Sequence, residues 1–225
     1  MILTKTQKLH DYYRGVLEME KCIKGIKDYY NVTADNWAEE WYPNETMLPL
    51  LKKFISLFPK NPRILDAGCG AGYESMRLFN LGAEMVGIDI SEKSIEIARN
   101  KNPDCKFELM DCMELDYSLG RFDGIVALAL IVHIIDNKLN IIFNNFYNIL
   151  NNNGFLFLAF VEGEGFSERR SYLEIEGEKY NREFYLHQSS RIIEIAKITG
   201  FKFSEEWFLN EPMGQWKFVV FKKEI

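Results

Sequence analysis

The feature that most constrains this chain is an apolar run that ends in an acidic residue and continues into a loop with glycine at every second position. It covers residues 63–72 (RILDAGCGAG), and a helical stretch follows over residues 73–81. Glycine tolerates a positive φ, and its missing side chain lets a ligand approach the backbone. A strand, a tight glycine loop and a helix N-terminus in this order indicate the place where α/β proteins bind nucleotide-like ligands.

Strand-like and helical segments alternate along most of the chain, which predicts the fold class. Strands are expected near residues 63–66, 84–89, 105–109, 122–127 and 154–160, and helices near 73–81, 91–101 and 137–150. This alternation predicts an α/β domain with a mostly parallel sheet and helices on both faces. Ser189 or Ser190 is expected to cap a helix that ends at Gly200, and two final strands are expected over residues 201–209 and 216–222.

Two further predicted strands also end in acidic residues. Residues 85–91 (MVGIDIS) contain Asp89, 23 positions after Asp66, and Ser91 is a plausible N-cap for the next helix. Residues 106–112 run into Asp111. An acidic residue about 20 positions past a glycine loop binds ribose hydroxyls in dinucleotide sites. The dinucleotide fingerprint is G-x-G-x-x-G, however, and here the third glycine comes one residue early.

The acid, the three glycines and the later acidic strand ends together resemble the D-x-G-x-G-x-G pattern of class I S-adenosylmethionine (SAM)-dependent methyltransferases, specifically the small-molecule domain families of type 11/25. The similarity spans roughly residue 29 to the C-terminus. It implies a doubly wound, Rossmann-like sheet of seven strands with an antiparallel edge hairpin. It also implies an N-terminal helical lid over residues 1–61, a SAM-binding methyltransferase domain over residues 62–225, and a lid-like insertion over residues 162–187.

The resemblance also implies the cofactor, which is SAM with S-adenosylhomocysteine (SAH) as product, and the residues that contact it. The loop that starts at Asp66 would hold the methionine end, Asp89 the ribose hydroxyls and Asp111 the adenine amino group. Each of these three carboxylates has the alternative role of capping a local turn or helix. The complete set of implied cofactor contacts is Asp66, Ala67, Gly68, Cys69, Gly70, Gly72, Asp89, Ile90, Asp111, Cys112, Met113, Ala127, Leu128, Tyr29 and Tyr30.

One histidine lies just past the fourth predicted strand, where many relatives also carry a histidine. Two roles for His133 stay open: a general base for a hydroxyl or acidic acceptor, or a structural histidine that hydrogen-bonds the backbone beneath the site. Ala129 and Val132 stand where many relatives have polar or acidic residues, so we expect an apolar pocket floor. With three scattered histidines, no metal site is expected.

Two segments are expected to form the pocket for the methyl acceptor. They are the aromatic stretch over residues 29–41 and the tyrosine-rich and charged stretch over residues 162–187, and both would lie at the carboxyl ends of the strands, where ligands enter open α/β sheets. Arginines in the second stretch suit an anionic acceptor, or alternatively balance the nearby glutamates on a solvated face. The candidate acceptor contacts are Trp37, Trp41, Arg169, Tyr172, Arg182 and Tyr185.

Composition narrows the choice of partners and compartment. The net charge of −6 disfavours nucleic acid, because phosphate contacts dominate that affinity. No stretch approaches the roughly 18 apolar residues of a membrane span, and the N-terminus does not read as a signal peptide. The four cysteines form no C-x-x-C pair, so we expect reduced thiols and a cytoplasmic location.

The resulting hypothesis is a cytoplasmic monomer or homodimer that methylates a small molecule. Three alternatives stay open at this stage: a protein or RNA methyltransferase, a catalytically silent nucleotide-binding module, and a NAD-dependent oxidoreductase. The sequence does not identify the acceptor.

Overall fold

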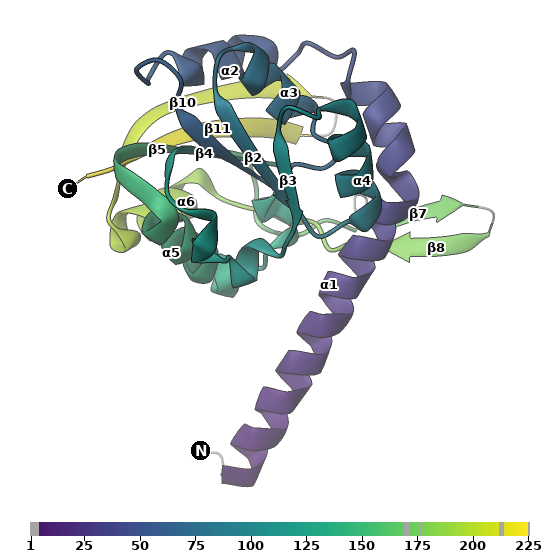
Figure 1. Cartoon of the computed structure of the whole chain (residues 1–225). Helices are drawn as coiled ribbons and strands as arrows, with labels where there is room; N and C mark the ends of the chain where they lie inside the picture. Colours follow the sequence, from purple (N-terminus) through teal and green to yellow (C-terminus); the bar gives the residue numbers. More distant parts are fainter. Residues whose placement is uncertain (1–4, 169–171, 176, 212–213, 225) are drawn as a thin grey trace.

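The computed structural model describes residues 5–168, 172–175, 177–211 and 214–224, and its centre is a seven-stranded sheet (Figure 1). The strand order is β10-β11-β5-β4-β1-β2-β3. The bounds of these strands are β1 Arg63–Ala67, β2 Glu84–Asp89, β3 Lys106–Leu109, β4 Phe122–Leu128, β5 Leu150–Val161, β10 Phe201–Glu211 and β11 Gly214–Lys223. The five neighbouring strands β5, β4, β1, β2 and β3 pair in parallel, whereas β11 and β10 are antiparallel. This arrangement confirms the predicted fold class.

Helices cover both faces of this sheet. Their bounds are α1 Lys5–Trp41, α2 Leu48–Ile55, α3 Tyr73–Asn80, α4 Glu92–Lys101, α5 Leu139–Ile149 and α6 Ser189–Thr199. Figure 1 shows α2 and α3 on one side of the sheet and α5 and α6 on the other. Because neighbouring residues of a strand point to opposite faces, Ile64 packs in the core under α2 while Leu65 packs in the core under α5. None of the described helices combines the length and apolar character that crossing a bilayer requires.

The N-terminal region differs from the sequence prediction. Residues 10–29 contain no proline and few helix breakers, which predicts a helix there, but α1 continues without a break to Trp41. Asn31, Val32 and Thr33 are weak helix formers, so packing decides the outcome. In the last turns of α1, Ala34 and Ala38 pack against Ala71 of the glycine loop, and this burial extends the helix.

Two further boundaries also differ from the prediction. Strand β5 begins at Leu150 rather than at residue 154, and its irregular start is accommodated by the register shift against β4 and by Asn153 in a left-handed conformation with φ 63°. Neither Ser189 nor Ser190 caps α6, which begins directly after Gln188. The carboxylate of Glu162 instead accepts the Ser189 backbone N–H at 3.2 Å. Gly200 ends α6 in a left-handed conformation, as predicted.

The expected insertion forms two small antiparallel pairs between β5 and α6. Strand β6 (Gly165–Phe166) pairs with β9 (Tyr185–Leu186), and β7 (Tyr172–Ile175) pairs with β8 (Glu178–Asn181). Figure 1 shows the β7–β8 hairpin beside α1. An ideal Cβ on Gly25 of α1 would lie only 2.9 Å from the Asn181 backbone oxygen, so glycine permits this close approach.

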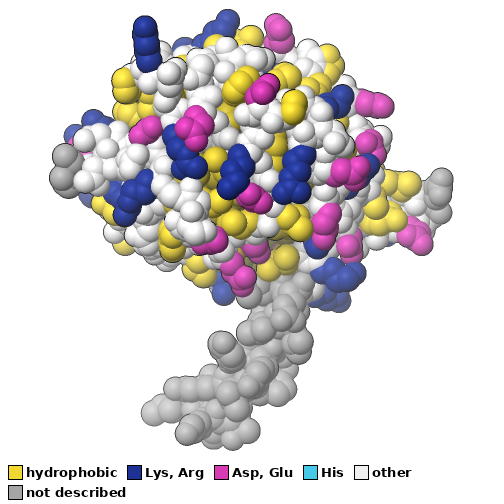
Figure 2. All heavy atoms as spheres, in the orientation of Figure 1, with side chains coloured by type: hydrophobic (Ala, Val, Ile, Leu, Met, Phe, Trp, Pro, Cys, Tyr) yellow, Lys and Arg dark blue, Asp and Glu magenta, His cyan; other side chains and the backbone are white. Residues whose placement is uncertain are grey.

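Charged side chains of both signs share the surface. Figure 2 shows Lys and Arg side chains interspersed with Asp and Glu side chains on the face in view. This mixture is typical of a solvated surface, and it differs from the single-sign patch that attracts a polyanion.

Candidate functional site

The glycine loop connects β1 to α3 and is shaped by three glycines with positive φ. The φ angles of Gly68, Gly70 and Gly72 are 75°, 51° and 84°. A Cβ on Gly72 would lie 2.9 Å from Asn102 Nδ2 and 3.0 Å from Ala98 Cβ, so this glycine lets the loop pack against α4. Gly70 has no such close neighbour, and its backbone borders a cavity instead. The loop is therefore packed on one side and open to a ligand on the other.

Asp89, at the end of β2, is held by two backbone donors. Its Oδ2 accepts the Gly70 N–H at 2.9 Å and its Oδ1 accepts the Ser91 N–H at 2.9 Å. Burial raises the pKa of Asp89, and these hydrogen bonds partly oppose that rise. A carboxylate has about four acceptor positions, so about two stay available for hydroxyl donors. Asp89 lines the cavity and fits a ribose hydroxyl pair.

Asp66, in contrast, is buried beneath the loop and does not line the cavity. Only 3% of its surface is exposed, and its Oδ2 accepts the Ser75 hydroxyl at 2.6 Å. Burial raises its pKa from 3.8 to about 7, although the bond from Ser75 opposes this shift. This bond joins the end of β1 to the first turn of α3, so in this structure Asp66 positions the helix that follows the loop.

Asp111, which follows β3, combines a local turn with a position on the cavity wall. Its Oδ1 accepts the Met113 N–H at 2.8 Å and so caps the short helix η1 (Cys112–Glu114). Partial burial raises the pKa of Asp111. The same part of the cavity is lined by Met110, Cys112 and Met113. A flat apolar group bound there would pack against these polarizable side chains, with the Asp111 carboxylate at its edge.

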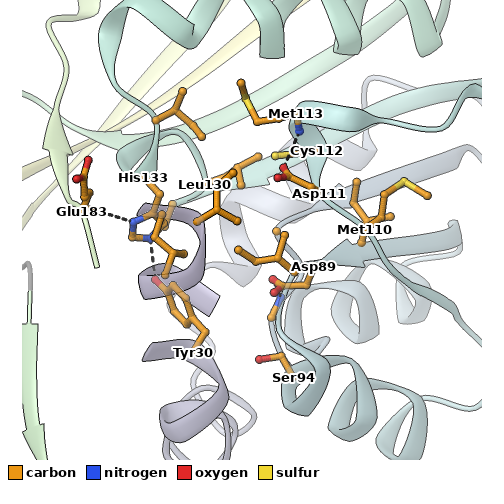
Figure 3. A pocket seen from close by; sticks show the side chains of 18 of the residues that line it. Tyr30, Asp89, Ser94, Met110, Asp111, Cys112, Met113, Leu130, His133 and Glu183 are labelled. Atoms are coloured by element: carbon orange, nitrogen blue, oxygen red, sulfur yellow. Dashed lines mark hydrogen bonds between the residues drawn. The ribbon is translucent and has the colours of Figure 1, made fainter. Parts of the chain in front are cut away.

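The cavity that these residues border has a volume of about 720 Å³. This lies within the roughly 300–1,000 Å³ of small-molecule sites. Figure 3 shows Asp89 and Asp111 on one side and Tyr30, His133 and Glu183 on the other. Ala129, directly after β4, also lines the cavity and adopts a left-handed backbone with φ 60°. Strained backbone of this kind is concentrated at functional sites.

One stripe of α1 forms a wall of the cavity. Its members are Cys22, Ile23, Ile26, Tyr30 and Trp37, which recur at the spacing of a single helix face. The indole Nε1 of Trp37 is buried and has no hydrogen-bond partner among the described residues. The cavity thus runs along α1 from the glycine loop toward the insertion.

A directional chain of hydrogen bonds joins α1, the segment after β4 and the insertion. Arg182 donates to the Tyr30 hydroxyl at 2.6 Å, and the Tyr30 hydroxyl lies 2.8 Å from His133 Nε2. His133 Nδ1 lies 2.6 Å from the Glu183 backbone oxygen. Because a carbonyl oxygen only accepts, Nδ1 carries the proton, and Nε2 accepts from Tyr30 (Figure 3). Burial and the nearby Arg182 charge lower the pKa of His133 to about 3.

Part of the chain that borders this cavity matches a known family. Residues 64–154 match a family described as "Methyltransferase domain". This segment of the chain is similar to that methyltransferase domain family. The matched segment begins within β1 and ends within β5, so it includes the glycine loop, Asp89, Asp111 and His133.

Two curated relatives are similar to part of the chain. The ubiquinone biosynthesis O-methyltransferase of Pelagibacter ubique is 31% identical over 109 residues, which cover 44% of this chain and 42% of the relative. The magnesium-protoporphyrin O-methyltransferase of Rhodobacter capsulatus is 36% identical over 76 residues, which cover 32% of this chain and 33% of the relative. The alignments therefore span less than half of either curated relative.

The fold is shared with a solved methyltransferase. The magnesium protoporphyrin IX methyltransferase from Synechocystis PCC 6803, with bound SAH, superposes with a TM-score of 0.70 at 18% sequence identity. The match covers 88% of this chain and 97% of that structure. At this identity, the similarity establishes the fold.

The cavity brings together about half of the residues predicted for the site. The predicted residues that line it are Tyr30, Trp37, Gly68, Gly70, Asp89, Ile90, Asp111, Cys112, Met113, Leu128, His133 and Tyr185. Those that lie elsewhere are Tyr29, Trp41, Asp66, Ala67, Cys69, Gly72, Ala127, Tyr172 and Arg182. Arg169 lies outside the described residues.

The predicted residues outside the cavity wall have other surroundings. Ala67 and Ala127 are fully buried in the core, and Tyr172 is 49% exposed on β7. Trp41 stacks on Tyr73 with ring centroids 6.1 Å apart. The Arg182 guanidinium lies 4.3 Å from the Tyr29 ring centroid. Because Arg182 also donates to the Tyr30 hydroxyl, it acts on the cavity through Tyr30.

Several cavity residues were missed by the sequence analysis. They include Cys22, Ile23, Ile26, Tyr73, Ser94, Met110, Leu130, Ile134 and Glu183. The helical spacing of the α1 stripe is a signal that was available in the sequence. Glu183 and Leu130 carried no such signal, because their placement depends on how the insertion and the segment after β4 fold over the sheet.

Proposed function

We propose that this protein is a SAM-dependent methyltransferase that acts on a small molecule. The observation that carries the proposal is a single cavity that joins the glycine loop, Asp89 and Asp111 to an apolar chamber beneath α1. The family match and the O-methyltransferase names of the relatives support the same reaction class. The bound SAH in the Synechocystis structure supports the choice of cofactor.

The described residues fit SAM at the carboxyl ends of β1, β2 and β3. The open side of the Gly68–Gly72 loop would take the methionine end, Asp89 the ribose hydroxyls and Asp111 the adenine amino group. When bound, SAM supplies an electrophilic methyl group on a sulfonium. The contribution of this chain is to hold that group in line with the acceptor and to exclude water, since positioning alone provides a large rate enhancement.

The acceptor would occupy the chamber between α1 and the insertion. Ile23, Ile26, Leu130 and Ile134 give it apolar walls, and Glu183 and Tyr185 give it a polar end. We propose that residues 1–61 and residues 162–187 act as two caps over a SAM-binding domain of residues 62–225. The contact between Gly25 and Asn181 brings the two caps together.

We propose a positioning role for His133. Its Nε2 already accepts from Tyr30, and its lowered pKa of about 3 makes it a weak base near neutral pH. Replacing His133 with asparagine is therefore expected to displace Tyr30 and weaken ligand binding. Methyl transfer by the unaltered protein should show no inflection near pH 6.5, the ordinary histidine value.

Calorimetric titration with SAM, SAH and NAD tests the cofactor proposal. We expect binding of SAM and SAH but not of NAD, and we expect Asp89→Ala to weaken SAH about 100-fold, because it removes the acceptor for two ribose hydroxyls. Asp116→Ala is the matched control, since Asp116 likewise accepts the backbone N–H of the residue two positions on, from Ser118 at 2.8 Å, but lies outside the cavity wall. Binding of NAD alone, or equal effects of the two variants, would refute the proposal.

A further inference from the structure

Tyr73, the first residue of α3, places its hydroxyl over the glycine loop. An ideal Cβ built on Gly70 would lie 3.6 Å from the Tyr73 hydroxyl oxygen. Both residues line the cavity. The side chain therefore stands beside the open backbone of the loop, on the side that a ligand would approach.

This hydroxyl has no hydrogen-bond partner among the described residues. The other tyrosines of the cavity differ from Tyr73, because Tyr30 bonds His133 and Arg182, and Tyr185 donates to Glu183. Burial raises the pKa of Tyr73 well above its ordinary value, so the hydroxyl keeps its proton and is a donor at neutral pH. Because Tyr73 lines the cavity, a ligand bound there can supply an acceptor for this hydroxyl.

Aromatic neighbours hold the Tyr73 ring in place. Trp41 stacks on it at an interplanar angle of 24°, and Tyr42 packs edge-on with ring centroids 6.1 Å apart. Tyr42 in turn donates to the Ala71 backbone oxygen at 2.8 Å, which ties this cluster to the loop. Residues at the end of α1 and just beyond it thus position the Tyr73 hydroxyl before any ligand binds.

We propose that the Tyr73 hydroxyl donates a hydrogen bond to the carboxylate at the methionine end of the cofactor, so that the site favours ligands with an intact aminocarboxylate. This inference rests on the proposed SAM site. Asp89 and Asp111 offer acceptors, which suit the hydroxyl and amino donors of ribose and adenine. A ligand carboxylate needs donors instead, and Tyr73 supplies one directly over the loop. Trp37, which also lines the cavity, has a second donor without a partner among the described residues, its Nε1.

The test compares two ligands that differ only at this end. 5′-Methylthioadenosine keeps the adenine, ribose and thioether of SAH but lacks the aminocarboxylate. Titration of the Tyr73→Phe variant should show SAH affinity about 10-fold weaker, because a hydrogen bond to a charged group is lost. Its affinity for methylthioadenosine should stay within about twofold of the unaltered protein.

Tyr117→Phe is the matched control, since it also removes one tyrosine hydroxyl, which bonds Asn145 outside the cavity wall. It should leave both affinities unchanged, and thermal melting should show that both variants fold. An unchanged SAH affinity in Tyr73→Phe, or an equal loss for both ligands, would overturn the inference and leave the cofactor proposal intact. If the unaltered protein binds neither ligand, the cofactor proposal fails and this inference fails with it.

Discussion

Replacing Asp66 with asparagine should stabilise the protein and flatten its dependence on pH. Burial raises the pKa of Asp66 from 3.8 to about 7 in the folded protein. Between these values the folded state holds a proton that the unfolded state has lost, so the free energy of unfolding falls as the pH rises. The stabilisation that comes from the proton on Asp66 is fully present below about pH 4 and is lost as the pH rises through 7. At about 1.4 kcal/mol per pKa unit, the loss amounts to about 2.5 kcal/mol between pH 5 and pH 8.

Urea denaturation of both proteins at pH 5 and pH 8 measures this difference. The amide introduced by Asp66→Asn would still accept the Ser75 hydroxyl, but it does not ionise, so the variant should lose about 2.5 kcal/mol less than the unaltered protein over this interval. Glu74 and Asp89, whose pKa values are also raised by burial, are present in both proteins. Equal losses in the two proteins would show that Asp66 is already ionised in the fold, and the argument from burial would be refuted.

Three further substitutions test the packing around the site. Gly87→Ala should destabilise the protein by about 1–3 kcal/mol in urea melts, because the new Cβ would lie 2.6 Å from the Phe107 ring. Ser91→Ala should cost about 1 kcal/mol in the same assay, since it removes the side-chain cap of α4. Gly25→Ala should push α1 away from Asn181 and increase amide hydrogen exchange in the insertion, even though alanine favours the helix by about 1 kcal/mol.

Each of these expectations has a contradicting result. Full stability of Gly87→Ala would mean that β2 and β3 adjust freely around the new methyl group. A Ser91→Ala variant as stable as the unaltered protein would show that water replaces the cap without loss. Unchanged hydrogen exchange in Gly25→Ala would show that the insertion does not depend on the close approach of Gly25 to Asn181.

The central sheet was predictable because its signals are local. The apolar strands, the glycine loop and the N-cap at Ser91 each lie within about ten residues of the elements that they specify. The cap of α6 was not predictable in this way. Its first N–H is satisfied by Glu162, which is 27 positions away in the sequence.

The part of the candidate site at the ends of the strands was predictable, but the part formed by α1 and the insertion was not. Asp89 ends β2 and Asp111 follows β3, and because the two strands end at the same edge of the sheet, strand prediction places these residues together. Tyr30 bonds His133 and Arg182 across 103 and 152 positions of the chain, and no local pattern reports such pairs. The cofactor role of Asp66 stays a prediction, because the structure puts its side chain beneath the loop, bonded to Ser75.

A crystal structure of the protein grown with SAH tests the central claim most directly. The account predicts SAH in the cavity, with its ribose hydroxyls on Asp89 and its adenine amino group at Asp111. The carboxylate should lie within hydrogen-bond distance of the Tyr73 hydroxyl. SAH bound elsewhere, or an unbound cavity at saturating SAH, would contradict the assignment of this cavity as the methyltransferase site.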